Sequence, residues 1–222
     1  MFEFDRTAFS VGTFREADSR VAYWRSRPPA ERLLAADVLI RRAYGLSPHE
    51  VRRVDRTVAR VKIRRMAYLF GKDLQDFIQC LNEAAVDYLL VGGYAVILHG
   101  YNRTTENINI WVNPTSDNFA RLVTAFHRFG LPLFDLTESK FLNVSAYDVW
   151  TYGVPPNAID LMPKVKGLDF SAAYANSSTY EFDDLSVRLI NYHDLITAKR
   201  AAGRLRDLND IEQLERGDTE EE

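Results

Sequence analysis

The sequence predicts an α/β (α+β) fold, in which a mixed β-sheet flanked by helices follows a helical N-terminal appendage. From residue 66 onward, helical and strand-like segments alternate, which is the order expected for a mixed sheet covered by helices. Residues 1–65 are instead rich in arginine and helical in pattern. The change of composition at Met66 therefore divides the chain into an N-terminal segment, 1–65, and a domain, 66–222.

In the N-terminal segment, a helix is predicted to begin at Pro28 and Pro29, because proline suits the first helical positions, and to end at Gly45. A run of seven basic residues against one acid, 52–65, follows it. The run has three readings: contact with an RNA backbone, a solvated helix, or a surface that packs the segment on the domain. The residues expected to share the buried face of the helix are Leu33, Ala36, Ile40 and Ala43.

In the domain, the expected elements follow from apolar periodicity and from turn residues. Helices are predicted at 73–86, 94–100 and 116–129, and over much of the last 30 residues. Strands are predicted at 87–93, 107–112, 147–153, 158–162 and 185–190.

Composition narrows the class of protein. The 222 residues are 46% apolar, so a sizeable core is possible, and the net charge of −3 offers no overall attraction to nucleic acid. A single cysteine, Cys80, excludes an internal disulfide and a multi-cysteine zinc site. No apolar run approaches the roughly 20 residues that a membrane span needs, and no signal-peptide pattern opens the chain. We therefore expect a cytoplasmic protein without a membrane partner.

The stretch VGGYA joins a predicted strand to a predicted helix. Gly92 and Gly93 carry no Cβ atom that would keep a phosphate from the backbone, and the helix start supplies free N–H groups. By itself such a turn is weak evidence, since most Gly-Gly turns bind nothing. Thirteen residues separate Gly93 from Asn107, and this position adds weight because the strand at 107–112 can return beside the first strand.

A second group of polar residues lies on predicted strands. Asn107 and Asn109 are two residues apart in strand 107–112, so they face the same side. Asp160 stands alone among apolar neighbours in strand 158–162, and a buried lone acid needs a partner or a metal. If the two strands are neighbours, the three side chains face one cleft. Three carboxylates at these positions would suit Mg²⁺.

These residues carry a resemblance to a known family. The stretch LLVGGYAVILHGYNRTTENINIWV resembles the signature of the DNA polymerase β-like nucleotidyltransferase superfamily, and VPPNAIDLMPKVKGLDF resembles its third-acid segment. DLITAKRAAGRLRDLNDIEQLE resembles the closing helices of the minimal, AbiEii-like nucleotidyltransferases of bacterial toxin–antitoxin and phage-defence systems. The resemblance covers about residues 70–216. Residues 1–65 more loosely resemble a small partner protein encoded beside such enzymes.

The resemblance implies a metal-dependent transferase that binds a nucleoside triphosphate with Mg²⁺. It would pass a nucleotidyl group to a hydroxyl of a tRNA end or a protein side chain. Asn107, Asn109 and Asp160 stand at the catalytic and metal-binding positions. The nucleotide-binding residues that the resemblance implies are Gly92, Gly93, Tyr94, Arg103, Thr104, Lys199 and Arg204.

The chain departs from the family at two positions. Asn107 and Asn109 stand where the family has aspartate. Neutral amides bind Mg²⁺ poorly, so we expect the metal site to be weakened and the chain to be inactive. The intact surroundings favour a deliberate change over natural decay. The alternative function is a non-catalytic, nucleotide-sensing or antitoxin-type binding module.

Other polar residues have two readings. Lys199 and Arg204 could hold phosphates. The other reading is a helix–helix ion-pair network among Arg204, Arg206, Asp207 and Asp210. Arg103 and Thr104 could likewise contact phosphate or belong to a solvated loop. The sequence leaves both choices open.

Overall fold

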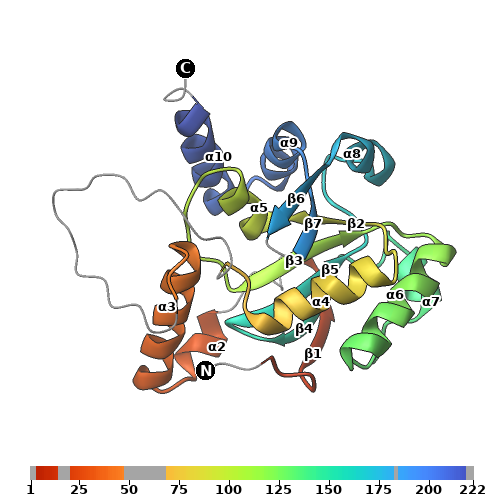
Figure 1. The fold of residues 1–222 in the computed structure, drawn as a ribbon, viewed down its shortest axis with the longest axis horizontal. Coiled ribbons are helices and arrows are strands. Elements are labelled where there is room, and N and C mark those ends of the chain that lie inside the picture. The colour runs from red at the N-terminus through yellow and green to blue at the C-terminus, as the bar shows by residue number, and fades with distance from the viewer. Residues whose placement is uncertain (1–3, 15–20, 48–68, 183–184, 219–222) are drawn as a thin grey trace.

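A computed structural model describes residues 4–14, 21–47, 69–182 and 185–218. Their strands form one mixed sheet in the order β1-β4-β5-β3-β2-β7-β6 (Figure 1). The pairs β3–β5 and β2–β7 are parallel, and the other pairs are antiparallel. The predicted α/β fold with a mixed sheet is thus confirmed. The strands are β1 (Phe9–Gly12), β2 (Tyr88–Val91), β3 (Asn107–Val112), β4 (Val149–Val154), β5 (Asn157–Met162), β6 (Ser178–Phe182) and β7 (Leu185–Leu189).

Helices flank the sheet, and their starts and ends follow local chemistry. In α6, the Thr115 side chain accepts a hydrogen bond from the Asn118 backbone N–H at the start, and Gly130 ends the helix in the left-handed region. The helices are α2 (Val21–Arg25), α3 (Pro29–Ala43), α4 (Lys72–Glu83), α5 (Gly92–Leu98), α6 (Ser116–Phe129), α7 (Glu138–Leu142), α8 (Phe170–Asn176), α9 (Tyr192–Ala202) and α10 (Leu205–Asp218).

The two faces of the sheet have different partners. Alternate residues of a strand point to opposite faces, so Tyr152 of β4 and its register partner Ile159 of β5 lie on the face away from Asp160. The ring of Tyr152 lies 5.1 Å from that of Phe126 in α6, and Phe126 contacts Phe77 in α4. Helices α4 and α6 therefore cover this apolar face, and Asp160 lies on the opposite face.

The residues before 66 form a strand as well as helices. The strand β1 pairs with β4 at one edge of the sheet, and Phe4 is buried in the core. The expectation that this segment is helical is therefore wrong for residues 9–12. The pattern FSVG is too short to show strand alternation. It becomes a strand because it pairs with the free edge of β4.

Helix α3 begins at Pro29 close to the predicted start, but it buries a different face. Its buried residues are Ala35, Leu39 and Ala43, whereas Leu33 is 72% exposed and Ile40 is 47% exposed. Two alanines on the buried face let the helix approach the domain closely. With this face inward, the larger side chains of Leu33 and Ile40 point outward. The predicted face was therefore wrong for all but Ala43, because apolar spacing alone allowed either rotation.

Polar contacts connect α2 and α3 to the domain. Arg42 donates to the Asn157 side chain at 2.5 Å and to the Pro156 carbonyl at 3.2 Å. The Trp24 indole donates to Glu106 at 2.9 Å. The run 52–65 and the boundary at Met66 lie outside the described residues, so the three readings of that run stay open.

Several elements were absent from the sequence-based prediction. The edge strand β6 is short and largely exposed: Tyr180 and Phe182 alternate with polar residues, but only Phe182 is buried. The short helices α7 and α8 lack a long apolar stripe. Among the helices that the structure describes, none combines the length and apolar character that a membrane span requires.

Candidate functional site

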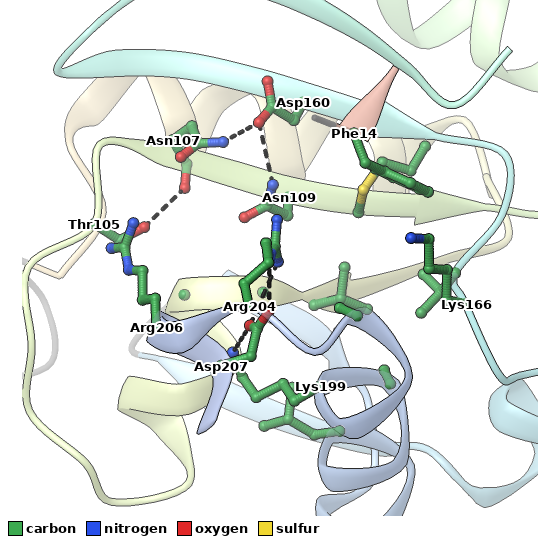
Figure 2. Close-up of a pocket in the computed structure, with 18 of the residues that line it drawn as sticks. Phe14, Thr105, Asn107, Asn109, Asp160, Lys166, Lys199, Arg204, Arg206 and Asp207 are labelled. Atoms are coloured by element: carbon green, nitrogen blue, oxygen red, sulfur yellow. Dashed lines mark hydrogen bonds and ion pairs between the residues drawn. The ribbon is translucent and has the colours of Figure 1, made fainter. Parts of the chain in front are cut away.

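Four neighbouring strands bring polar side chains together on one face of the sheet. Asn109 of β3 lies opposite Asp160 of β5, and Asp160 lies opposite Thr151 of β4. On the other side, Asn109 lies opposite Val91, the residue before Gly92. Directly opposed residues project to the same face, so their side chains meet across the sheet. Asn107 is two residues before Asn109, so its side chain projects to the same face, beside Asp160 (Figure 2).

Asp160 accepts hydrogen bonds from three neutral groups. One carboxylate oxygen accepts from the side-chain amides of Asn107 and Asn109, the latter at 3.2 Å. The other oxygen accepts from the Thr151 hydroxyl at 2.7 Å. Because an ionised carboxylate can only accept, both amides turn their NH₂ groups toward it. These three donors stabilise an anion that is 3% exposed.

The glycine turn makes room for this polar group. Gly92 has φ of +66°, and a Cβ atom there would lie 2.7 Å from the Asn109 side-chain carbon Cγ. A Cβ atom on Gly93 would lie 2.8 Å from the Thr105 Cβ. The missing Cβ atoms thus admit the chain's own side chains at 105 and 109.

A cavity of about 640 Å³ opens over these residues. Gly92 and Gly93 line it together with Asn107, Asn109 and Asp160. Cationic side chains outnumber carboxylates around it, which suits an anionic ligand. The charged residues of its lining are Arg103, Lys166, Lys199, Arg204, Arg206, Asp160 and Asp207.

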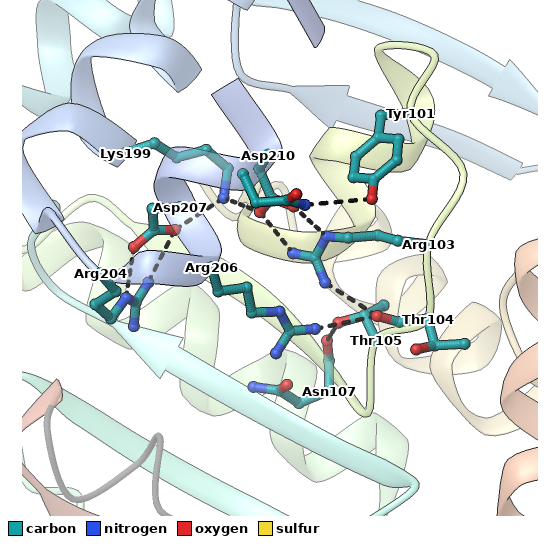
Figure 3. Close-up of polar contacts among 11 residues, drawn as sticks. Tyr101, Arg103, Thr104, Thr105, Asn107, Lys199, Arg204, Arg206, Asp207 and Asp210 are labelled. Carbon is teal, nitrogen blue, oxygen red and sulfur yellow. Dashed lines mark hydrogen bonds and ion pairs between the residues drawn. The ribbon is translucent and has the colours of Figure 1, made fainter. Parts of the chain in front are cut away.

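Two buried aspartates hold the cations at one wall (Figure 3). Lys199 donates to Asp207 at 3.0 Å and to Asp210 at 2.6 Å. Asp210 also pairs with Arg103, at 2.8 Å. On the other side, Asp207 pairs with Arg204, at 2.6 Å. The pair Arg204–Asp207 belongs to the ion-pair network that the sequence left open, and Lys199, which that reading did not include, lies between the two aspartates. We call Arg103, Lys199, Arg204 and Arg206 the cationic wall.

The network changes the acidity of its members. Burial by itself would raise the pKa of Asp207, but the hydrogen bond from Arg204 and the charge of Lys199 outweigh it and lower the pKa. For Arg103, burial and the neighbouring Arg206 lower the pKa, and they outweigh the effect of Asp210. Asp207 is therefore ionised at neutral pH.

Not every predicted residue lines the cavity. Tyr94 is 1% exposed and stacks on Phe70 in the core, with ring centroids 4.9 Å apart. The exposed Thr104 contributes its carbonyl, which accepts hydrogen bonds from Arg103 and Arg206, both at 3.0 Å. Neither side chain is among the lining residues. The predicted residues that do line the cavity are Gly92, Gly93, Arg103, Asn107, Asn109, Asp160, Lys199 and Arg204.

Sequence reasoning missed other lining residues. Thr105 and Lys166 lie in the stretches that carry the resemblance but were given no role, and Phe14 is far away in the sequence. Arg206 and Asp207 were considered only as members of an ion-pair network. The charge-rich pattern RLRDLND around them was the available signal.

A divalent metal does not fit the residues as they stand. In the described parts of the chain, no three His, Cys, Asp or Glu side chains are grouped as metal ligands. Among Asn107, Asn109 and Asp160, the carboxylate is that of Asp160, and the NH₂ groups of both asparagines point at it. The amide donors thus supply part of the stabilisation that a cation would give to this carboxylate.

No protein-family model matches the chain, and no curated protein matches it.

Proposed function

We propose that this chain is a nucleoside triphosphate-binding protein of the metal-dependent nucleotidyltransferase type, inactivated by asparagine at 107 and 109. The observation that carries the proposal is the row Asn109, Asp160 and Thr151 beneath a cavity with a cationic wall. Phosphate oxygens need such cations, and Asn107, Asn109 and Asp160 stand at the positions where the resemblance expects the carboxylates.

In a form with aspartate at both positions, the acceptor hydroxyl would attack the α-phosphorus. The bond to the β-phosphate would break and pyrophosphate would leave. Asp160, already a hydrogen-bond acceptor for Thr151 at 2.7 Å, would take the hydroxyl proton. Three carboxylates would suit Mg²⁺, whose chemistry is to neutralise charge on phosphate oxygens. The acceptor would be a tRNA end or a protein side chain, in a toxin–antitoxin or defence setting.

The unchanged chain would bind the triphosphate without turnover. Asn107 and Asn109 stabilise the Asp160 carboxylate by hydrogen bonds, which reduces its need for a metal. This same observation favours the second candidate, a nucleotide-sensing or antitoxin-type binding module. The two candidates differ in whether aspartate at 107 and 109 restores transfer.

The test is the double variant Asn107→Asp/Asn109→Asp. It is incubated with α-labelled triphosphates, total RNA and candidate proteins, with Mg²⁺ or with EDTA. We expect label in one acceptor pool with Mg²⁺ and none with EDTA or with the unchanged chain. Mg²⁺ should also raise the Tm of the double variant, because three close carboxylates repel one another without it.

A matched control adds a carboxylate outside the cavity. Asn113→Asp lies just past the end of β3 and should neither gain transfer nor respond to Mg²⁺. A double variant that binds Mg²⁺ and triphosphate but labels nothing favours the binding module. If the unchanged chain binds no triphosphate in calorimetry, both candidates are wrong.

A further inference from the structure

The cavity has an apolar end that the cationic wall does not explain. Phe14, two residues past β1, lines it, and Lys166 lies near the same side, away from Arg206 and Thr105 (Figure 2). The ring of Phe14 is half-buried, and it is not stacked on any aromatic ring in the described parts of the chain. The residues that form this apolar end are Phe14, Val149, Met162 and Val165.

The apolar end continues the polar row along the same strands. Val149 is two residues from Thr151 in β4, and Met162 is two residues from Asp160 in β5. Each therefore faces the cavity, roughly 7 Å along the strand from its polar neighbour. Gly12 of β1 pairs with Val149, which brings Phe14 beside them. A ligand whose charged part lies over Asp160 thus has an apolar surface within reach.

One carboxylate holds the parts of this surface together. The Phe14 backbone N–H donates to Asp148 Oδ2 at 3.1 Å, and Asp148 Oδ1 pairs with Lys164 Nζ at 2.8 Å. Asp148 precedes Val149, and Lys164 precedes Val165. Burial would raise the pKa of Asp148, but Lys164 and the Phe14 N–H lower it, so the carboxylate stays ionised at neutral pH. The position of Phe14 is therefore fixed by the domain as well as by β1.

An aromatic ring among aliphatic side chains, in a cavity that also has a cationic wall, suits one kind of ligand. That ligand has a flat heterocycle joined to an anionic tail. We infer that Phe14 stacks on a nucleobase of the bound ligand, so that residues before 66 supply a base-contacting side chain. The base belongs either to the triphosphate or to the end of an RNA acceptor. The inference rests on the proposed function, since it assumes that phosphates bind at the cationic wall.

The experiment compares Phe14→Leu with the unchanged full-length chain by calorimetry. The probes are ATP, GTP, CTP, UTP and inorganic tripolyphosphate, which has the charges without the base. Leucine keeps the apolar character and loses the ring. If the base of the triphosphate stacks on Phe14, the affinity for at least one triphosphate falls about tenfold, the typical effect of one lost base–aromatic contact. Affinity for tripolyphosphate stays the same.

Phe9→Leu is the matched control. Phe9 lies in β1 and its ring contacts Phe134 and Tyr152 at about 5.0 Å, but it does not line the cavity. This variant should lower Tm through lost packing and leave every affinity unchanged. An equal loss of triphosphate affinity in both variants would mean that the effect is structural, and the inference would be wrong.

A further probe, the RNA trinucleotide CCA, separates the two sources of the base. If Phe14→Leu weakens CCA binding and leaves the triphosphates unchanged, the stacked base belongs to the acceptor. If the triphosphates and CCA bind but no affinity responds to Phe14→Leu, the inference fails and the proposed function stands. If neither triphosphates nor tripolyphosphate bind the unchanged chain, the proposed function fails, and the inference fails with it.

Discussion

Replacement of Gly92 by alanine tests how closely the glycine turn packs on β3. Two separate costs follow from the structure. The φ of +66° is strained for any residue with a Cβ atom, which costs ~1–2 kcal/mol. The new Cβ atom would also lie 2.7 Å from Asn109 Cγ, and forced overpacking of this kind costs ~1–3 kcal/mol. We expect Gly92→Ala to lower the free energy of unfolding by roughly 2–5 kcal/mol.

Two other glycines separate these costs. Gly130 has a similar φ, +73°, but a Cβ atom there meets nothing within 4 Å, so Gly130→Ala measures strain by itself. Gly93 is not strained, but its Cβ atom would lie 2.8 Å from Thr105 Cβ, so Gly93→Ala measures contact. Part of that contact cost is offset because alanine favours helix over glycine by ~1 kcal/mol.

The assay is urea unfolding followed by the fluorescence of the buried Trp111 and Trp150. A shift of the midpoint at constant m value reports stability. The reasoning is refuted if Gly92→Ala costs no more than Gly130→Ala. That result would mean that Asn109 can move away freely, and that the turn does not position the row.

Two further predictions concern the ion pairs and the contact between α3 and the domain. Because the folded pKa of Asp207 is lowered, its ion pairs stabilise the fold above the unfolded pKa of about 4. This contribution is lost as pH falls through the folded pKa. Below pH 4, the free energy of unfolding of Asp207→Asn should therefore fall less steeply with pH than that of the unchanged chain. If urea unfolding gives the same slope against pH for both proteins, the prediction is wrong. Arg42→Met removes charged donors to Asn157 and Pro156 and should cost about 2 kcal/mol. The exposed Arg32→Met on the same helix should change stability by less than about 0.5 kcal/mol, and equal effects in urea unfolding would show that the contact contributes nothing.

Part of the fold could be predicted from the sequence because local signals agreed with one another. The strand predicted at 107–112 and the helix predicted at 116–129 have these bounds in the structure. In each case, the segment has a clear apolar periodicity and turn residues mark its end. The missed strands β1 and β6 lie at the edges of the sheet, where few buried side chains leave a pattern. Long-range pairing, which no local signal encodes, creates them.

In the candidate site, too, some features were predictable from the sequence and others were not. The positions of Asn107, Asn109 and Asp160 on strands were predictable, and alternation also predicted that Asn107 and Asn109 share a face. Their common carboxylate contact depended on the register that sets Asn109 opposite Asp160. The partner Thr151 was not predictable, because it reaches Asp160 only through the pairing of β4 with β5.

The sequence by itself determined the class of fold, the glycine turn and the two amides on one face of a strand, because these depend on neighbours within a few residues. Tertiary structure decided that Lys199 lies between Asp207 and Asp210, that α3 turns Leu33 outward, and that Phe14 reaches the cavity. Charges and rings distant in sequence choose partners only once the sheet has set which strands are neighbours. A one-residue change of register would turn the side chains of a whole strand to the other face.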